Sequence, residues 1–159
     1  MINYLIGDAT EPKINGIKFI IHCCNSIGGW GAGFTGALSK KWKQPEELYR
    51  LWHKKGRNCF SEFKLGKVQF IQVEKDIFVA NMIAQEGIDY KNGIPPVRYE
   101  ALRECLKEVN LTVNEFDSAT IHCPRICTGL AGGDWTIIEQ IIKDTMSVDV
   151  YVYDLPKIE

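Results

Sequence analysis

Two glycine-rich loops, each directly after a short apolar run, constrain the fold of this chain more than any other feature. The first is GGWGAG at 28–33, after the run at 18–25, and the second is GLAGG at 129–133, after the run at 120–126. Both precede segments with helical periodicity. A strand, a glycine loop and a helix start together present backbone N–H groups to a phosphate. Two such loops predict a clamp on a ligand that carries two phosphates or on a phosphate-rich body.

Length and composition predict one globular domain, 1–159. The chain has 159 residues, of which 45% are hydrophobic and 25% are charged, and this is enough to build a core. The net charge of −1 argues against a general nucleic-acid binder and a membrane-surface protein, because both usually carry a basic excess. Local basic stretches at 40–43 and 54–57 are interpreted most simply as solvated helix faces.

The six cysteines predict free thiols in a cytoplasmic protein rather than a disulfide framework. Cys23, Cys24, Cys123 and Cys127 lie in or beside predicted strands, where a thiol packs as a small apolar group. No cysteine pair has zinc-ligand spacing with the three histidines, so no metal site is expected. The first six residues are too short for a signal peptide and are expected to form a strand. The apolar runs are too short to cross a membrane.

Strands and helices alternate along the chain except at one hairpin, which predicts a three-layer α/β/α sandwich with a mixed central sheet. Pro45 favours the start of the second helix and Gly56 favours its end. In such sheets ligands bind outside the carboxyl ends of the strands, where both glycine loops and Asn25 are expected. The predicted strands are 4–6, 18–23, 67–73, 78–82, 119–123 and 148–153, and the predicted helices are 34–41, 46–55, 97–110 and 135–146.

Four motifs along the chain resemble those of macro domains. They are Gly7-Asp8-Ala9-Thr10; His22-Cys23-Cys24-Asn25 with Gly31-Ala32-Gly33; Pro124-Arg125-Ile126 before the second glycine loop; and Tyr151-Val152-Tyr153-Asp154-Leu155. The resemblance covers nearly the whole chain. It is nearest to the branch that includes ADP-ribose-1″-phosphate processing enzymes and terminal ADP-ribose protein glycohydrolases. It implies an α/β/α module that binds ADP-ribose, and no cofactor is expected.

The resemblance also assigns parts of the ligand to parts of the chain. It implies that Asp8 accepts from the adenine amine, that the Ala9 N–H meets a ring nitrogen, and that Asn25 contacts the distal ribose. The two loops would clasp the diphosphate, and Tyr153 and Leu155 would form an apolar wall for adenine. The expected ligand-binding residues are Gly7, Asp8, Ala9, Asn25, Trp30, Gly31, Ala32, Gly33, Gln85, Arg125, Ile126, Cys127, Thr128, Gly129, Leu130, Ala131, Gly132, Tyr153 and Leu155.

The expected function is hydrolysis of an ADP-ribose derivative, by removal of a 1″-phosphate or by release of ADP-ribose from a modified protein or nucleic acid. Asn25, His22 and Asp134 are the expected catalytic residues, which would hold and activate a water. Terminal ADP-ribose glycohydrolases use a lysine and an aspartate where this chain has Gln85 and Ala131. This departure favours the alternative of a reader that binds ADP-ribose without chemistry. A Rossmann-type site is disfavoured because the first loop lacks GxGxxG spacing. A monomer is expected.

Several of these residues also have a plainer structural interpretation. His22 is more simply interpreted as a core histidine, and the alternative role of Asn25 is to form a turn with its side-chain amide. For Asp134, water activation and a helix N-cap are equally favoured interpretations. Trp30 is expected to fold back over the first loop as a lid. Cys127 is expected to pack as a neutral thiol. The plainer account of the segment 87–96 is a surface excursion, and the alternative is a cover for the distal ribose.

Overall fold

The strands and helices fall close to where periodicity and turn residues predict them. The computed structural model describes residues 1–31 and 33–157, so Ala32 of the expected ligand-binding set lies outside the described residues. The elements are β1 (Ile2–Ile6), β2 (Ile17–Asn25), α1 (Phe34–Lys41), α2 (Gln44–Lys55), β3 (Val68–Glu74), β4 (Ile77–Gln85), α3 (Tyr99–Val113), β5 (Ala119–Cys123), α4 (Trp135–Thr145) and β6 (Val150–Asp154).

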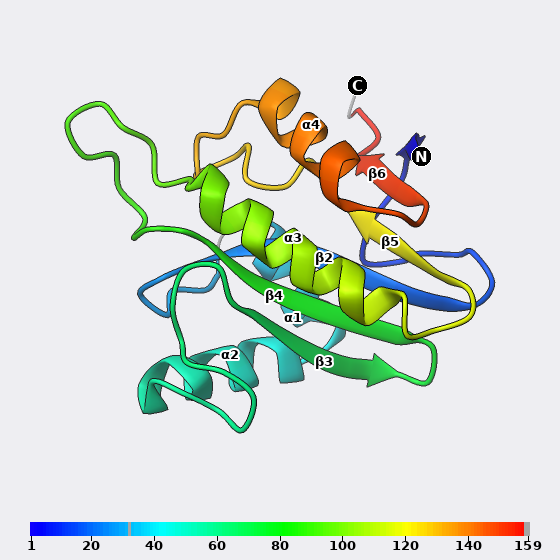
Figure 1. The fold of residues 1–159 in the computed structure, drawn as a ribbon, viewed down its shortest axis with the longest axis horizontal. Helices are drawn as coiled ribbons and strands as arrows, with labels where there is room; N and C mark the ends of the chain where they lie inside the picture. Colours follow the sequence, from blue (N-terminus) through cyan, green and yellow to red (C-terminus); the bar gives the residue numbers. More distant parts are fainter. Residues whose placement is uncertain (32, 158–159) are drawn as a thin grey trace.

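The strands of the described residues form one mixed sheet in the order β1-β6-β5-β2-β4-β3 (Figure 1). Neighbouring strands are parallel except for β3 and β4, which form an antiparallel hairpin. The predicted mixed sheet with one hairpin is therefore confirmed. Because parallel neighbours end at the same edge of a sheet, the segments after β1, β2, β4, β5 and β6 all leave at one edge.

Helices cover both faces of this sheet, which gives the predicted three layers (Figure 1). On one face, Phe19 of β2 shares a core cluster with Leu106 of α3 and Ile138 of α4. On the other face, Ile20 of β2 packs with Leu38 of α1. Consecutive strand residues point to opposite faces, so β2 supplies apolar side chains to both cores. This explains why its sequence is a continuous apolar run rather than an alternating one.

Local signals determine where α2 begins and ends. Pro45 lies in its first turn, and Gly56 caps its carboxyl end in the left-handed conformation with a φ of 73°. A residue with no Cβ adopts this conformation without steric cost, which is why Gly56 ends the helix. Both predicted signals are confirmed.

Most element ends lie within a few residues of the prediction, and three of the differences shape the site. β2 and β4 run on to Asn25 and Gln85, which pair with each other at the edge of the sheet. α3 begins at Tyr99 instead of residue 97, because Val97 is held outside the helix. Its N–H donates to the Ala131 carbonyl at 3.0 Å, and Val97 also forms a bridge with Gln85. These contacts attach the segment before α3 to the second glycine loop.

No helix within the described residues combines the length and the apolar character needed to cross a membrane.

Candidate ligand site at the carboxyl ends of the strands

A disulfide between Cys23 and Cys127 joins the two glycine loops. Cys23 lies two residues before the end of β2 and Cys127 lies two residues before the second loop, and their Cα atoms are 5.8 Å apart. The expectation of free thiols was wrong for this pair, because β2 and β5 are parallel neighbours and bring together residues 104 positions apart. The other four cysteines are free, and of these only Cys59 is exposed.

The Asn25 side chain holds the first glycine loop in shape. Its Oδ1 accepts from the N–H groups of Ile27 at 3.1 Å and Gly29 at 2.9 Å, and its Nδ2 donates to the Gly29 carbonyl at 3.0 Å. The Tyr49 hydroxyl donates to the Asn25 carbonyl at 2.5 Å. The turn-forming interpretation of Asn25 is therefore confirmed. Its contact with a distal ribose stays a prediction.

Helix α2 packs against this loop and supports it, which the sequence did not indicate. Arg50 donates from Nη1 to the Gly28 carbonyl and from Nη2 to the Trp30 carbonyl, each at 3.2 Å. The His53 ring lies so close to Gly28 that a Cβ there would collide with it, and Gly28 has a φ of 75°. A glycine is required at position 28 for both reasons. No sequence signal marked these helix residues, because their role depends on where α2 packs.

Trp30 does not form the expected lid. Its indole packs against the core cluster of Ile20 and Leu38, and its Nε1 donates to Ser39 Oγ at 2.7 Å. The prediction failed because the loop turns the indole back toward α1, where it is partly buried. The tryptophan therefore anchors the loop to the body of the protein. Gly31, beside it, donates its N–H to Thr35 Oγ1 at 3.1 Å.

His22 lies in the interior, as its plainer interpretation proposed. It is 2% exposed, its Nε2 donates to Asn81 Oδ1 at 2.5 Å, and its ring contacts Trp30 and Phe34. Burial lowers the pKa of His22 to about 4, so the imidazole is neutral at pH 7. The ring is therefore shielded from bulk solvent.

The second glycine loop is fastened by its own backbone and by the segment 87–96. The Gly133 N–H donates to the Cys127 carbonyl at 2.7 Å, and Cys127 adopts a φ of 62°. A Cβ at Gly132 would collide with Tyr90 and Pro95. The segment 87–96 therefore packs against this loop, although Tyr90 itself is exposed.

Asp134 caps α4. Its Oδ1 accepts from the Thr136 N–H at 2.8 Å, and its own N–H donates to the Tyr99 hydroxyl at 3.0 Å. The N-cap interpretation is therefore confirmed. The carboxylate is exposed, so capping does not remove it from solvent.

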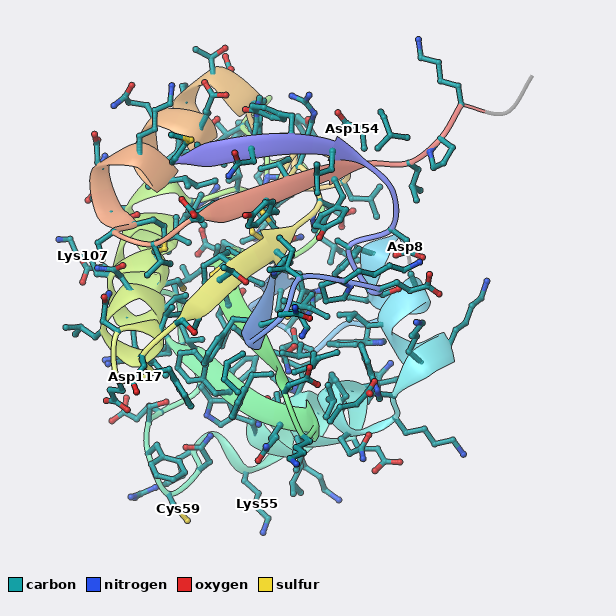
Figure 2. The ribbon with its side chains drawn as sticks, turned by 90° about the vertical axis from the view of Figure 1, so that its right-hand side faces the viewer. Asp8, Lys55, Cys59, Lys107, Asp117 and Asp154 are labelled. Atoms are coloured by element: carbon teal, nitrogen blue, oxygen red, sulfur yellow. A yellow bond between two sulfur atoms is a disulfide. The ribbon has the colours of Figure 1, made fainter. Side chains whose placement is uncertain are left out.

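The ends of β1 and β6 bring together the residues expected at adenine. Ile6 pairs with Asp154, and the Gly7 N–H donates to the Asp154 carbonyl at 2.9 Å. A Cβ at Gly7 would touch the Tyr153 ring at 3.5 Å, so the ring lies directly against this turn. Figure 2 shows Asp8 and Asp154 near the ends of β1 and β6.

The polar groups at this end of the sheet have partners within the protein. Asp8 Oδ1 accepts from Thr10 N at 2.9 Å and from Thr10 Oγ1 at 2.7 Å. The Tyr153 hydroxyl lies 2.7 Å from His122 Nδ1. Burial raises the pKa of Tyr153 to about 12. Leu155 is 71% exposed and Ala9 is buried.

The remaining expected residues differ in how they could meet a ligand. Arg125 forms a two-point ion pair with Asp154 at 2.8 and 3.0 Å, and its guanidinium lies over the rings of Tyr4 and Trp135. This pair lowers the pKa of Asp154. Buried members of the set can offer only backbone groups, and these are Ile126, Cys127 and Ala131. Exposed or partly exposed members are Gly31, Gly33, Thr128, Gly129, Leu130 and Gly132.

Within residues 1–31 and 33–157, no group of three or more His, Cys, Asp or Glu side chains is arranged to hold a metal ion.

Known proteins resemble this chain over nearly its whole length, although no protein-family model matches it. An uncharacterised 17.5 kDa protein of Enterobacteria phage T4, from the tk-vs intergenic region, is 31% identical over 152 residues, which cover 92% of this chain and 90% of that protein. A solved Bacteroides thetaiotaomicron protein of unknown function is 53% identical, with 98% of both chains covered and a TM-score of 0.93.

Two further solved structures show the fold and the family of this chain. A Thermosipho africanus DarTG in complex with ADP-ribose is 14% identical, with 90% of this chain and 40% of that chain covered and a TM-score of 0.66, so the likeness is one of fold. A macrodomain protein from Streptomyces coelicolor is 46% identical, with 97% of this chain and 99% of that chain covered and a TM-score of 0.83. Because that identity holds over nearly the whole length of both chains, the chain belongs to the macrodomain family.

Proposed function

We propose that this protein binds ADP-ribose at the carboxyl edge of its sheet, with the diphosphate between the two glycine loops. The observation that carries the proposal is the disulfide-linked pairing of these loops after the neighbouring strands β2 and β5. Glycine loops at strand ends offer backbone N–H groups to phosphate oxygens. The solved DarTG complex with ADP-ribose has the same fold, which supports this choice of ligand.

The adenine would lie at the other end of this edge, where β1 and β6 finish. The Asp8 carboxylate would accept from the exocyclic amine, and the exposed Leu155 would cover the ring beside Tyr153. The distal ribose would then point toward Asn25 and Gln85, which pair at the ends of β2 and β4. This order of parts matches the order of the strand ends along the sheet.

We propose further that the bound ligand is a 1″-linked ADP-ribose derivative that the protein hydrolyses. Water would replace the 1″ substituent, giving ADP-ribose and either inorganic phosphate or the unmodified protein or nucleic acid. Of the three expected catalytic residues, Asp134 is the best candidate for contacting this water, because its carboxylate is exposed. His22 is buried, and the Asn25 amide is occupied by the loop. Positioning by the loops would supply most of the acceleration.

A reader that binds ADP-ribose without chemistry is the second candidate. Gln85 and Ala131 replace the lysine and aspartate on which terminal ADP-ribose glycohydrolases depend. The structural roles of His22 and Asn25 also favour it, since both side chains stabilise the fold. In either case we expect a monomeric, cytoplasmic protein with one domain over 1–159. Light scattering tests the monomer, limited proteolysis tests the single domain, and cell fractionation tests the location.

Isothermal titration calorimetry with ADP-ribose, against AMP and NAD, tests binding first. A micromolar dissociation constant for ADP-ribose and weaker binding of both controls are expected. Turnover of ADP-ribose-1″-phosphate and of ADP-ribosylated protein or nucleic acid is measured next. Binding without turnover of any of these substrates would support the second candidate, a reader without catalytic activity. If ADP-ribose does not bind, the proposal is overturned.

A further inference from the structure

A closed circuit of hydrogen bonds runs from Trp30 through α1 and α2 and back to Trp30. The Trp30 Nε1 donates to Ser39 Oγ at 2.7 Å, and Ser39 Oγ donates to Glu46 Oε1 at 3.0 Å. Arg50 Nε donates to Glu46 Oε2 at 2.9 Å, and Arg50 Nη2 donates to the Trp30 carbonyl at 3.2 Å. The circuit therefore holds one loop residue by both its side chain and its main chain.

Opposite charges on Glu46 and Arg50 strengthen the circuit. Glu46 receives hydrogen bonds on both carboxylate oxygens, and the bond from Arg50 is the main cause of its lowered pKa. An ionised Glu46 fixes the planar guanidinium of Arg50, which can then reach two carbonyls at once. The second of these belongs to Gly28, at 3.2 Å from Nη1.

The loop that the circuit holds would otherwise have many conformations. Gly28, Gly31 and Gly33 have φ values of 75°, 141° and 63°, which residues other than glycine rarely adopt. Glycine loses more backbone entropy on ordering than any other residue, so an unsupported loop of this composition would order only when a ligand binds. Aromatic contacts from His22 and Tyr49 to the Trp30 ring add a second restraint.

We propose that Trp30 and Arg50 are positioning residues that hold the first glycine loop ready for a diphosphate before the ligand arrives. This inference rests on the proposed binding of ADP-ribose. Arg50 draws the carbonyls of Gly28 and Trp30 toward α2, so these two oxygens face the Arg50 guanidinium and not the opposite side of the loop. A carbonyl oxygen turned outward would repel a phosphate, and the circuit prevents this. Preorganisation of this kind increases affinity without any contact between the positioning residue and the ligand.

Two conservative substitutions break the circuit at different points. Trp30→Phe keeps an aromatic ring but removes the Nε1 donor, and Arg50→Lys keeps the charge but cannot bond Glu46 and both carbonyls together. Each is expected to weaken ADP-ribose binding about fivefold, which corresponds to one hydrogen bond. In the double variant the loss should be smaller than the product of the single losses, because either change alone opens the circuit.

The chain offers a matched control for each substitution. Trp42 donates its Nε1 to Glu74 Oε2 at 3.0 Å, so Trp42→Phe removes an equivalent bond away from the loop. Arg103 contacts Asp144 at 3.5 Å between α3 and α4, so Arg103→Lys weakens an equivalent ion pair on the opposite face. Both controls should bind ADP-ribose within about twofold of wild type, since the bonds they weaken go to Glu74 and Asp144 and not to the first loop.

The experiment combines calorimetry with ADP-ribose and amide hydrogen exchange of the ligand-free proteins. The inference predicts faster exchange in the peptides that cover 26–33 for both variants, with exchange in β2 and β4 unchanged and the affinity reduced. Reduced affinity with unchanged loop exchange overturns it, because the residues would then act by direct contact. Unchanged affinity in both variants overturns it as well. If wild type binds no ADP-ribose, the proposed function fails. Amide hydrogen exchange in 26–33, compared between wild type and the two variants, then shows by itself whether the circuit orders the loop.

Discussion

The sulfur atoms of Cys23 and Cys127 bond β2, two residues before its end, to a position two residues before the second glycine loop. The separation of the two loops is therefore covalently restrained in addition to being determined by the packing of β5 against β2. A ligand that contacts both loops would meet a site whose width is already defined. The bond also closes a long stretch of chain, because its cysteines are 104 positions apart.

Loss of this disulfide should destabilise the protein. Cys127→Ser, Cys23→Ser, or reduction of wild type with a dithiol should each lower the free energy of unfolding by about 2–5 kcal/mol, because the unfolded chain regains entropy. Thermal or denaturant unfolding, with and without reductant, measures this. Cys59→Ser is the control, because this cysteine is free and exposed. If reductant leaves the stability of wild type unchanged, the bond contributes nothing and the prediction fails.

Gly132→Ala should destabilise the second glycine loop by about 1–3 kcal/mol. The new Cβ would collide with Tyr90 and Pro95, and the residue has a φ of 71°, so steric and backbone strain act together. Gly129→Ala in the same loop is the matched control, since a Cβ there meets no atom within 4 Å. Denaturant unfolding of both variants measures the difference. Equal stabilities would mean that segment 87–96 moves aside without cost.

Substitutions at Asp134 should separate its capping role from its proposed catalytic role. Asp134→Ala removes the acceptor for the Thr136 N–H and should cost about 1 kcal/mol of stability. Asp134→Asn keeps an equally good cap but removes the charge, so stability should stay near wild type while turnover of a 1″-linked substrate falls about 100-fold. Unfolding and single-turnover kinetics give the two readings. A fully active Asp134→Asn enzyme would exclude the carboxylate as the group that activates water.

Stability should fall on acidification because His22 is buried as the neutral imidazole. Its pKa is lowered to about 4, against about 6.5 in the unfolded chain. Between these two pH values the unfolded state binds a proton at His22 and the folded state does not, so protonation favours unfolding. The contribution of the neutral ring is complete above pH 6.5 and is lost as the pH falls toward 4. At pH 5 the loss is on the order of 2 kcal/mol.

A comparison of wild type with His22→Gln measures this contribution, since glutamine can still donate to Asn81 but does not titrate. Its stability should change less than that of wild type between pH 7 and pH 5. The buried His122, whose pKa is also lowered to about 4 by burial, contributes a similar slope to both proteins. Identical slopes for the two proteins would contradict the burial of a neutral His22.

Features that depend on neighbouring residues could be predicted from the sequence. Pro45 and Gly56 mark the two ends of α2, and Asp134 caps α4, because these signals act within one turn of a helix. The apolar runs before the glycine loops indicated buried parallel strands, and the strand ends indicated the edge at which a ligand would bind. The three-layer sandwich follows from these local patterns.

The sequence by itself therefore determined the elements, their layers and the edge of the sheet that carries the loops. Only the tertiary structure decided that Cys23 meets Cys127, that Arg50 supports the first loop and that Trp30 turns inward. These contacts join residues on different elements, so they depend on strand order and helix packing. Periodicity records which face of an element is buried, but not which distant residue covers it.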